Sequence, residues 1–281
     1  INAAGRMKHG AYAVNILREK SIENAKMTAE SIELFNSNRQ KLDQEITQEA
    51  LLQIENAKEL NNESTIVYDP IWNKGVIGIV ASRLIETYYR PTLVFTKSGE
   101  FLTASARSVK GYDIYEALQN CSQFIEQFGG HKYAAGLTIK ESNYKLFKEA
   151  FEKEVLRGLP SHLKSPEIKI DKIIKLGDIT PKFYRILKQF APFGPDNNTP
   201  LFMTKAVVDS GYGKCVGNDN KHLKIKVKEA DSNSFNAIGF GLGNKLSLIR
   251  DKANFDILYS IDENHWDGRI SLQLKLKDLK N

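Results

Sequence analysis

The chain has 281 residues, of which 41% are hydrophobic and 26% are charged. This composition is ordinary for a folded protein in water and excludes a disordered or collagen-like chain. The length exceeds what one hydrophobic core usually organises, so we expect two domains. No apolar run approaches the roughly 18 to 20 residues of a membrane helix, and there is no signal-peptide pattern, so we expect a cytoplasmic protein without a membrane partner.

The excess positive charge lies in the C-terminal part of the chain. The net charge is +6, and residues 1–160 contain 20 Lys and Arg against 20 Asp and Glu, whereas residues 161–281 contain 20 against 14. We therefore expect a polyanion to bind mainly to the C-terminal part. Cys121 and Cys215 match no metal-ligand spacing, and we interpret both as structural.

The first sixty residues predict the end of one domain and a helix leading out of it. Ile1 to Gly10 read like the interior of a folded domain, so we expect the chain to be a fragment of a longer protein. From Ser21 to about Leu60 there is no Pro or Gly, and apolar residues recur at helical spacing, which predicts a long connecting helix. The Asn36-Ser37-Asn38 cluster is the predicted break, because Asn and Ser favour caps and turns.

The next segment alternates between the two kinds of element. Strands are predicted at Ile66–Tyr68, Thr92–Phe95, Phe101–Ser105 and Ala135–Ile139, and helices at Val76–Tyr89, Tyr112–Phe128 and Tyr144–Leu156. This alternation predicts an α/β domain over residues 66–160, preceded by a connecting segment over residues 1–65.

A linker with Gly158, Pro160 and Pro166 leads into a region where strands dominate. Leu223 to Lys228 and Leu272 to Lys277 alternate apolar and polar residues, which is the period of half-buried strands. We expect a small β-barrel over residues 161–281, with a short helix at Pro181–Gln189. The predicted fold class is therefore α/β plus all-β.

Three motifs of the α/β segment combine small residues with groups that bind phosphate. Gly75-Val76-Ile77-Gly78 precedes a helix, where backbone N–H groups attract anions, although a tight turn explains it equally well. Thr103, Ser105 and Arg107 share a strand face, so that a hydroxyl and a guanidinium can converge on one phosphate; a solvated surface Arg is the alternative.

The third motif places a histidine among small residues. Gly129-Gly130-His131 is followed by Ala134-Ala135-Gly136, and His131 there can donate to a phosphate oxygen or transfer a proton. A lone histidine is more often structural, but the crowding of Gly and Ala favours a ligand site.

Lysines project from strand faces in the C-terminal part. Lys224, Lys226 and Lys228 alternate with apolar residues, and Lys275 and Lys277 repeat the arrangement. Two basic strand faces suit a phosphate backbone, and a solubilising exterior is the alternative. Tyr212, Trp266 and Phe193 are candidates for base stacking. No metal-binding cluster of Asp, Glu and His is recognisable, so we expect no metal in this chain.

Taken together, these segments resemble the RecJ exonucleases of the DHH phosphoesterase superfamily. The resemblance rests on Ile1-Asn2-Ala3-Ala4-Gly5-Arg6, Trp72–Arg83, Ser105-Ala106-Arg107-Ser108 and Phe128-Gly129-Gly130-His131 with Ala134-Ala135-Gly136. Pro192-Phe193-Gly194, Pro200-Leu201-Phe202, His222-Leu223-Lys224 and Ala237–Phe240 resemble the oligonucleotide-binding (OB) domain of RecJ proteins. Many relatives have His where this chain has Asn73, so that position receives no catalytic role.

The resemblance implies a C-terminal, substrate-binding portion of a 5′ exonuclease that degrades single-stranded DNA in repair and recombination. It implies two Mn²⁺ or Mg²⁺ ions in an N-terminal catalytic domain, outside this chain, and a DHH-associated α/β domain and an OB-like barrel within it. His131 is then the expected catalytic residue. Ser105, Arg107, Gly129, Gly130, Arg6 and Arg83 are the expected phosphate ligands, and Lys224, Lys226, Lys228, Lys275, Lys277 and Trp266 the expected nucleic-acid contacts.

Single-stranded DNA is the expected partner of a monomer, with single-strand-binding protein and a helicase as further candidates. Two alternatives stay open. One is a stand-alone module that binds single-stranded nucleic acid, and the other is a phosphodiesterase for short oligonucleotides or cyclic dinucleotides, although such enzymes generally lack the barrel.

Overall fold

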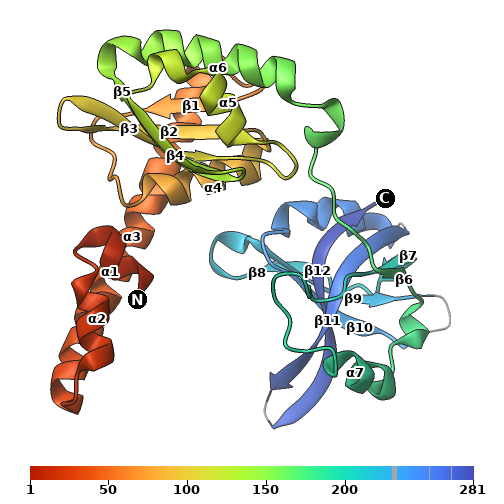
Figure 1. Cartoon of the computed structure of the whole chain (residues 1–281). Coiled ribbons are helices and arrows are strands. Elements are labelled where there is room, and N and C mark those ends of the chain that lie inside the picture. Colours follow the sequence, from red (N-terminus) through yellow and green to blue (C-terminus); the bar gives the residue numbers. More distant parts are fainter. Residues whose placement is uncertain (230–232, 253, 267) are drawn as a thin grey trace. The chain divides into compact units, whose positions relative to one another are not determined.

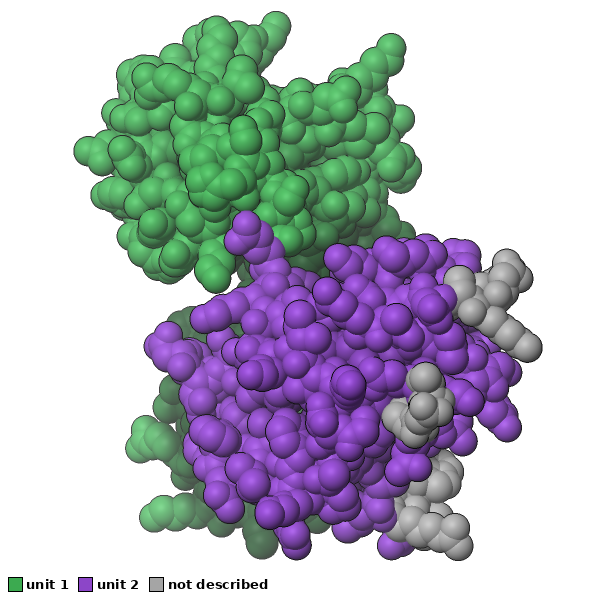
Figure 2. Space-filling model, turned by 90° about the vertical axis from the view of Figure 1, so that its right-hand side faces the viewer, with its two compact units in different colours: residues 1–166 green, residues 167–281 purple. Residues whose placement is uncertain are grey.

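The structure is a computed structural model that describes residues 1–229, 233–252, 254–266 and 268–281. It divides into two compact units, Ile1–Pro166 and Glu167–Asn281 (Figure 2). Each unit has its own sheet and its own hydrophobic core. The predicted boundary between residues 65 and 66, inside the first unit, stays a prediction.

The first unit begins with three helices. They are α1 (Asn2–Met7), α2 (Ala11–Arg18) and α3 (Ile22–Asn56). The hydroxyl of Ser21 caps α3 by accepting a hydrogen bond from the backbone N–H of Asn24 at 3.4 Å. The predicted break at residues 36–38 is wrong, because α3 continues through it. There Asn36 accepts a hydrogen bond from the guanidinium of Arg39, one turn on, at 3.0 Å.

A five-stranded sheet follows, in the order β1-β2-β3-β5-β4. Its strands are β1 (Thr65–Tyr68), β2 (Thr92–Ser98), β3 (Phe101–Arg107), β4 (Gln127–His131) and β5 (Ala134–Lys140). The helices of this part are α4 (Ile77–Tyr88), α5 (Ile114–Asn120) and α6 (Tyr144–Gly158). β1 pairs with β2 in parallel, and the other pairs are antiparallel.

Two helical layers cover the sheet (Figure 1). On one face, Leu102 and Ala104 of β3 join a core with α5 and α6, in which Phe147 and Phe151 are fully buried. Burying a phenylalanine of this kind contributes about 1.5–3 kcal/mol. On the other face, β1 and β2 pack against α3 and α4. That second layer leaves β5 and β4 uncovered, since Gly129, His131 and Gly136 are exposed.

One predicted helix of this unit is only partly right. The helix predicted at Tyr112–Phe128 ends at Asn120 and is followed by a 3-10 turn (Ser122–Phe124) and by β4, which contains Phe128. The Gly129-Gly130-His131 motif therefore lies in an edge strand of the sheet. This position gives the motif a fixed register against β5.

The second unit is a sheet of seven strands within the described residues, in the order β6-β7-β11-β12-β10-β9-β8. Its elements are β6 (Lys172–Ile173), α7 (Pro181–Lys188), β7 (Phe202–Asp209), β8 (Lys214–Val216), β9 (His222–Lys228), β10 (Phe235–Gly239), β11 (Phe255–Trp266) and β12 (Arg269–Lys280). β7 also pairs with β9, so the run β7-β11-β12-β10-β9 meets itself at its two ends.

The alternation predicted for these strands is confirmed. Leu223, Ile225 and Val227 of β9 are buried in the core of this unit, and Leu274 and Leu276 of β12 join them. The buried phenol of Tyr259 shares a 2.7 Å hydrogen bond with the hydroxyl of Thr204, which satisfies both groups. The predicted fold class, α/β plus all-β, is thus confirmed.

Candidate functional site

The sheet register brings Ser105, Arg107 and His131 to one face. Arg107 on β3 lies opposite Ala134 on β5, and Ala134 lies opposite His131 on β4. Directly opposed residues point to the same face of a sheet. The backbones of Arg107 and His131 are therefore about 10 Å apart, which is two strand spacings, and only Ala134 lies between them. One step along, Ser105, Gly136 and Gly129 form a parallel row. The two rows form one strip of the sheet face, which we call the floor, and three of its residues, Ala134, Gly136 and Gly129, are small.

The helix α4 approaches this floor from the side. A Cβ added at Gly78 would lie 2.9 Å from Nη2 of Arg107 and 3.0 Å from Oγ of Ser105. Arg107 donates from Nη1 to Oγ of Ser105 at 3.0 Å and to the backbone oxygen of Ala106 at 2.8 Å. The first turn of α4, the hydroxyl and the guanidinium therefore meet at one place. Helix N-termini favour negative charge, as does a guanidinium.

A second guanidinium belongs to the same neighbourhood. Burial lowers the pKa of Arg107, and the nearby positive charge of Arg6 lowers it further. The carbonyl oxygen of Arg6 would lie 2.0 Å from a Cβ at Gly75, so α1 approaches the turn before α4 closely. Throughout the described ranges, neither Arg6 nor Arg107 forms an ion pair with a carboxylate. Two neighbouring cations without a counter-ion favour a bound anion.

His131 is exposed and held by its own hairpin. Its Nδ1 accepts a hydrogen bond from the backbone N–H of Tyr133 at 3.3 Å, which leaves Nε2 as the donor in the neutral ring. The hairpin tip is anchored because the carbonyls of Lys132 and Tyr133 accept from Ile114 and Ser108, both at 3.0 Å. Gly130 has φ +150, and a Cβ there would lie 2.4 Å from the carbonyl oxygen of Ala134, so only glycine fits.

Arg83 has a different environment from the other predicted phosphate ligands. Its guanidinium donates from Nε and Nη2 to the two carboxylate oxygens of Asp43, both at 2.7 Å. The Asp43 side chain is fully buried, and its hydrogen bond raises the pKa of Arg83. This pairing joins α4 to α3, and the predicted phosphate contact of Arg83 stays untested. Asp43 itself was missed, although it occupies a position of the apolar stripe that Ile46 and Ala50 continue.

Asn73, which received no catalytic role, organises the turn before α4. Its side-chain oxygen accepts a hydrogen bond from the backbone N–H of Gly75 at 2.8 Å, and its carbonyl accepts from Val76 and Ile77 at 2.9 and 3.2 Å. Asn73 therefore fixes the turn that contains Gly75 and leads into α4.

The predicted lysines of the second unit point outward from β9 and β12, which are separated by β10. Lys224, Lys226 and Lys228 occupy alternate positions of β9. Lys275 of β12 lies on the same face as Lys224, because Ile238 of β10 stands opposite both. The ammonium of Lys275 forms an ion pair with Asp262, and Lys277 is exposed beside a register shift between β11 and β12. Trp266 ends β11, but its side chain lies outside the described part of the structure.

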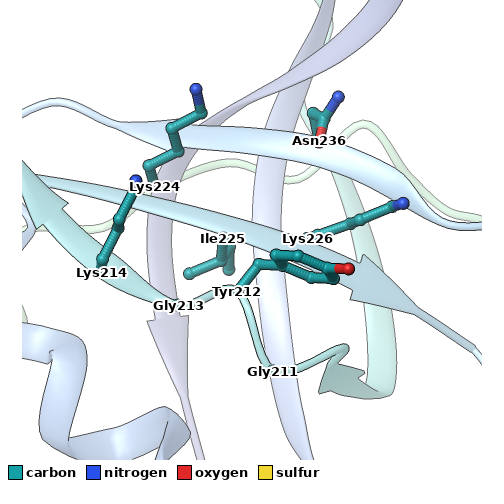
Figure 3. A pocket seen from close by; sticks show the side chains of 8 residues that line it. All are labelled: Gly211, Tyr212, Gly213, Lys214, Lys224, Ile225, Lys226 and Asn236. Carbon is teal, nitrogen blue, oxygen red and sulfur yellow. The ribbon is translucent and has the colours of Figure 1, made fainter.

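A groove lies beside the middle of β9. It has a volume of about 590 Å³ and is lined by Gly211, Tyr212, Gly213, Lys214, Lys224, Ile225, Lys226 and Asn236 (Figure 3). Lys214 and Asn236 were not predicted as contacts. The alternating pattern of β9 predicted that the lysines of this strand point outward. The side chains from β8 and β10 join them in the groove through strand pairing, which the pattern does not show.

Among residues 1–229, 233–252, 254–266 and 268–281, no group of three or more His, Cys, Asp or Glu side chains is arranged to hold a metal ion. No helix in those ranges is long and apolar enough to cross a membrane.

Two family models match the chain. Residues 61–156 match the DHHA1 domain, and residues 170–278 match the RecJ OB domain. The first match contains the floor with Ser105, Arg107 and His131, and the second contains the groove beside β9.

The chain is similar to curated proteins named single-stranded-DNA-specific exonuclease RecJ. It is 29% identical to the one from Bacillus subtilis over 99% of this chain and 35% of that protein, and 28% identical to the one from Escherichia coli over 99% of this chain and 49% of that protein. It thus spans between about a third and a half of the length of these relatives.

Solved structures agree on the fold. The crystal structure of RecJ in complex with Mn²⁺ from Thermus thermophilus matches all of this chain and 40% of its own, with a TM-score of 0.85 and 24% identity. A structure of exonuclease RecJ bound to manganese matches 59% of this chain and 41% of its own, with a TM-score of 0.53 and 27% identity. The chain therefore combines a DHHA1 domain with a RecJ OB domain, and its predicted resemblance to the RecJ family is confirmed.

Proposed function

We propose that this chain is the substrate-binding portion of a RecJ-like exonuclease. It holds single-stranded DNA while a catalytic domain outside this chain hydrolyses the strand from its 5′ end. The proposal is supported by the two domain matches and by the names of the relatives, which are single-strand-specific exonucleases.

The observation that carries the proposal is the meeting of Ser105, Arg107 and the first turn of α4 beside an uncovered strip of sheet. The side-chain contacts at Gly78 place a guanidinium, a hydroxyl and a helix N-terminus within reach of one anion. The residues opposite them on β5 are Ala134 and Gly136, which leave room for a phosphate group. A terminal or scissile phosphate of a DNA strand has the charge and oxygens that this arrangement binds.

Each residue then has a defined task. Arg107 binds two phosphate oxygens through its guanidinium, and Ser105 donates its hydroxyl. Arg6 adds charge, since its field reaches Arg107. His131 donates from Nε2 across the glycine floor, and Gly129 and Gly130 let the strand approach the backbone. Lysines of β9 bind phosphates of single-stranded DNA.

The hydrolysis itself is assigned to divalent metals in the catalytic domain. The related Thermus thermophilus structures contain Mn²⁺ or Mg²⁺. Within the described part of this chain, no group of three or more His, Cys, Asp or Glu side chains is arranged to hold such an ion. We expect the chain alone to bind DNA without cleaving it.

The test is a titration of the chain with fluorescently labelled DNA, followed by fluorescence anisotropy. The ligands are a single strand with a 5′-phosphate, the same strand with a 5′-hydroxyl, and a duplex, each at several salt concentrations and with Mn²⁺ added to detect cleavage. We expect salt-sensitive binding of the single strands, with the 5′-phosphate preferred. Arg107→Ala should abolish the preference for the 5′-phosphate.

Arg157→Ala is the matched control, because that arginine is exposed on α6 and paired with Glu154 at 2.7 Å. It should bind both strands as the unmodified chain does. The proposal is wrong if Arg107→Ala keeps the 5′-phosphate preference, or if the chain binds duplex as tightly as single strand.

A further inference from the structure

The groove beside β9 is built around the carboxylate of Asp209, the last residue of β7. Oδ2 of Asp209 accepts hydrogen bonds from the backbone N–H groups of Gly211 and Gly213, at 3.0 and 2.9 Å. Oδ1 accepts from the backbone N–H of Lys226 in β9, at 3.1 Å. One side chain therefore fixes both the loop between β7 and β8 and its position against β9.

The two glycines leave this loop little freedom. Gly211 has φ +88, a conformation that L side chains rarely adopt. A Cβ at Gly213 would lie 2.7 Å from Cδ1 of Ile249 and 3.1 Å from Oδ2 of Asp209. The loop geometry thus depends on glycine on both sides of one residue, Tyr212.

Tyr212 is an aromatic ring that this ordered loop presents to solvent. Its side chain is 65% exposed, and the ammonium of Lys226 lies 5.6 Å from the ring centroid. Figure 3 shows the ring lying beside Lys226 at the edge of the groove. An exposed ring on a fixed loop contributes little to the core, but it offers a preorganised stacking face.

The other side chains of the groove are cationic or amide-bearing. Lys214 of β8 lies directly opposite Lys224 of β9, and Asn236 of β10 lies directly opposite Lys226. Like charges directly opposite each other destabilise a sheet, so the pair Lys214–Lys224 favours an anion between or above the two ammonium groups. In the ranges that the structure describes, no carboxylate forms an ion pair with Lys214, Lys224 or Lys226.

We propose that this groove binds one nucleotide of a single DNA strand, with its base stacked on Tyr212. The side chains of Lys214 and Lys224 hold the flanking phosphates, and the amide of Asn236 contacts the edge of the base. Asp209 is a positioning residue that holds Tyr212 and Lys226 in register. This assignment rests on the proposed function, and it adds a base contact that the lysines alone do not provide.

The experiment separates the base contact from the phosphate contacts. The chain is titrated with a labelled oligothymidylate and with an abasic strand of the same length and phosphate count, and binding is followed by fluorescence anisotropy. Tyr212→Ala should weaken binding of the oligothymidylate about tenfold and leave binding of the abasic strand unchanged. Tyr212→Phe should restore the affinity, because stacking needs the ring and not the hydroxyl.

Phe190→Ala is the matched control, since Phe190 is 62% exposed in the same unit but lies outside the groove. It should bind both strands as the unmodified chain does. A thermal melt of Tyr212→Ala should match that of the unmodified chain, because the ring is not part of the core.

Each other outcome has a definite meaning. If Tyr212→Ala binds oligothymidylate normally, or loses affinity for both strands equally, the stacking contact is refuted while the proposed function stands. If free thymidine monophosphate competes as strongly as the strand does, the groove is a mononucleotide site and the inference is wrong. If the unmodified chain binds neither strand, the proposed function itself fails.

Discussion

Arg83 of α4 donates two hydrogen bonds of 2.7 Å to the carboxylate of Asp43 of α3, and the Asp43 side chain is fully buried. A second arginine, Arg39, reaches the same carboxylate at 3.5 Å from one turn away. A buried carboxylate without its partner costs several kcal/mol. The pair is therefore a structural link between α3 and the DHHA1 domain.

The first prediction concerns the stability of this link. Arg83→Met should lower the free energy of unfolding by about 3 kcal/mol or more, because Asp43 stays buried without its main partner. Asp43→Asn should cost less, since the Arg83 side chain is 44% exposed and can be hydrated. Urea denaturation followed by circular dichroism measures both values.

The control for that prediction is an exposed pair on the same helix. Lys41 and Glu45 lie 3.9 Å apart, with side chains 76% and 50% exposed. Lys41→Ala should change the free energy of unfolding by less than about 0.5 kcal/mol. If Arg83→Met costs no more than Lys41→Ala does, the structural role of the pair is disproved.

A second prediction tests the close approach of α4 to Arg107. Gly78→Ala adds a methyl group 2.9 Å from Nη2 of Arg107, the mobile end of a long side chain. The guanidinium should move and weaken a phosphate hydrogen bond, which lowers the affinity for 5′-phosphorylated DNA about fivefold. Stability should not fall, because alanine is the better helix former.

Gly177→Ala serves as the comparison, since a Cβ there meets nothing within 4 Å. It should leave DNA binding unchanged. Equal affinities of the Gly78→Ala and Gly177→Ala chains for the 5′-phosphorylated strand would show that the phosphate does not bind beside Gly78.

The sequence predicted most elements correctly where the apolar pattern was strong. β9 and β12 alternate buried and exposed residues, and α3 follows an apolar stripe. β4 was missed because its residues are mostly exposed and two of them are glycines, so that only pairing with β5 defines it as a strand. The polar cluster at residues 36–38 suggested a break, but solvated side chains on the open side of a long helix do not interrupt it.

The motifs in the sequence predicted which residues belong to the site, but not how those residues are arranged. Ser105, Arg107 and His131 came from their motifs, whereas their common face required the register through Ala134 and Gly136. No pattern in the neighbouring sequence indicates that the Asp209 carboxylate holds the loop, or that Lys214 lies opposite Lys224. Both arise from pairings between segments that are separate in the sequence.

A third prediction concerns alkaline pH. Burial, and to a smaller extent the nearby charge of Glu154, raise the pKa of the Cys121 thiol to about 11. In the unfolded chain the thiol ionises near pH ~8.5–9, so unfolding releases a proton between about pH 9 and 11. The stabilisation from the neutral thiol is complete below that window and is lost as the pH rises through it, by about 1–2 kcal/mol at pH ~10.

Urea denaturation at a series of pH values measures this effect. The Cys121→Ala chain should lose less stability between neutral and alkaline pH than the unmodified chain, because it lacks the buried thiol. Identical slopes for the Cys121→Ala chain and the unmodified chain would rule out a contribution of this thiol.

The last prediction ranks two lysines of the second unit by their ion pairs. The ammonium of Lys275 is paired with Asp262, whereas Lys224 forms no ion pair within the described residues. A lysine already paired in the protein releases fewer counterions when DNA binds, because its own carboxylate must be displaced. Lys224→Ala should therefore reduce the slope of log affinity against log salt by about 1, and Lys275→Ala by clearly less. Anisotropy titrations over a range of salt concentrations give both slopes, and a larger change for Lys275→Ala would place the strand over β12 instead of β9.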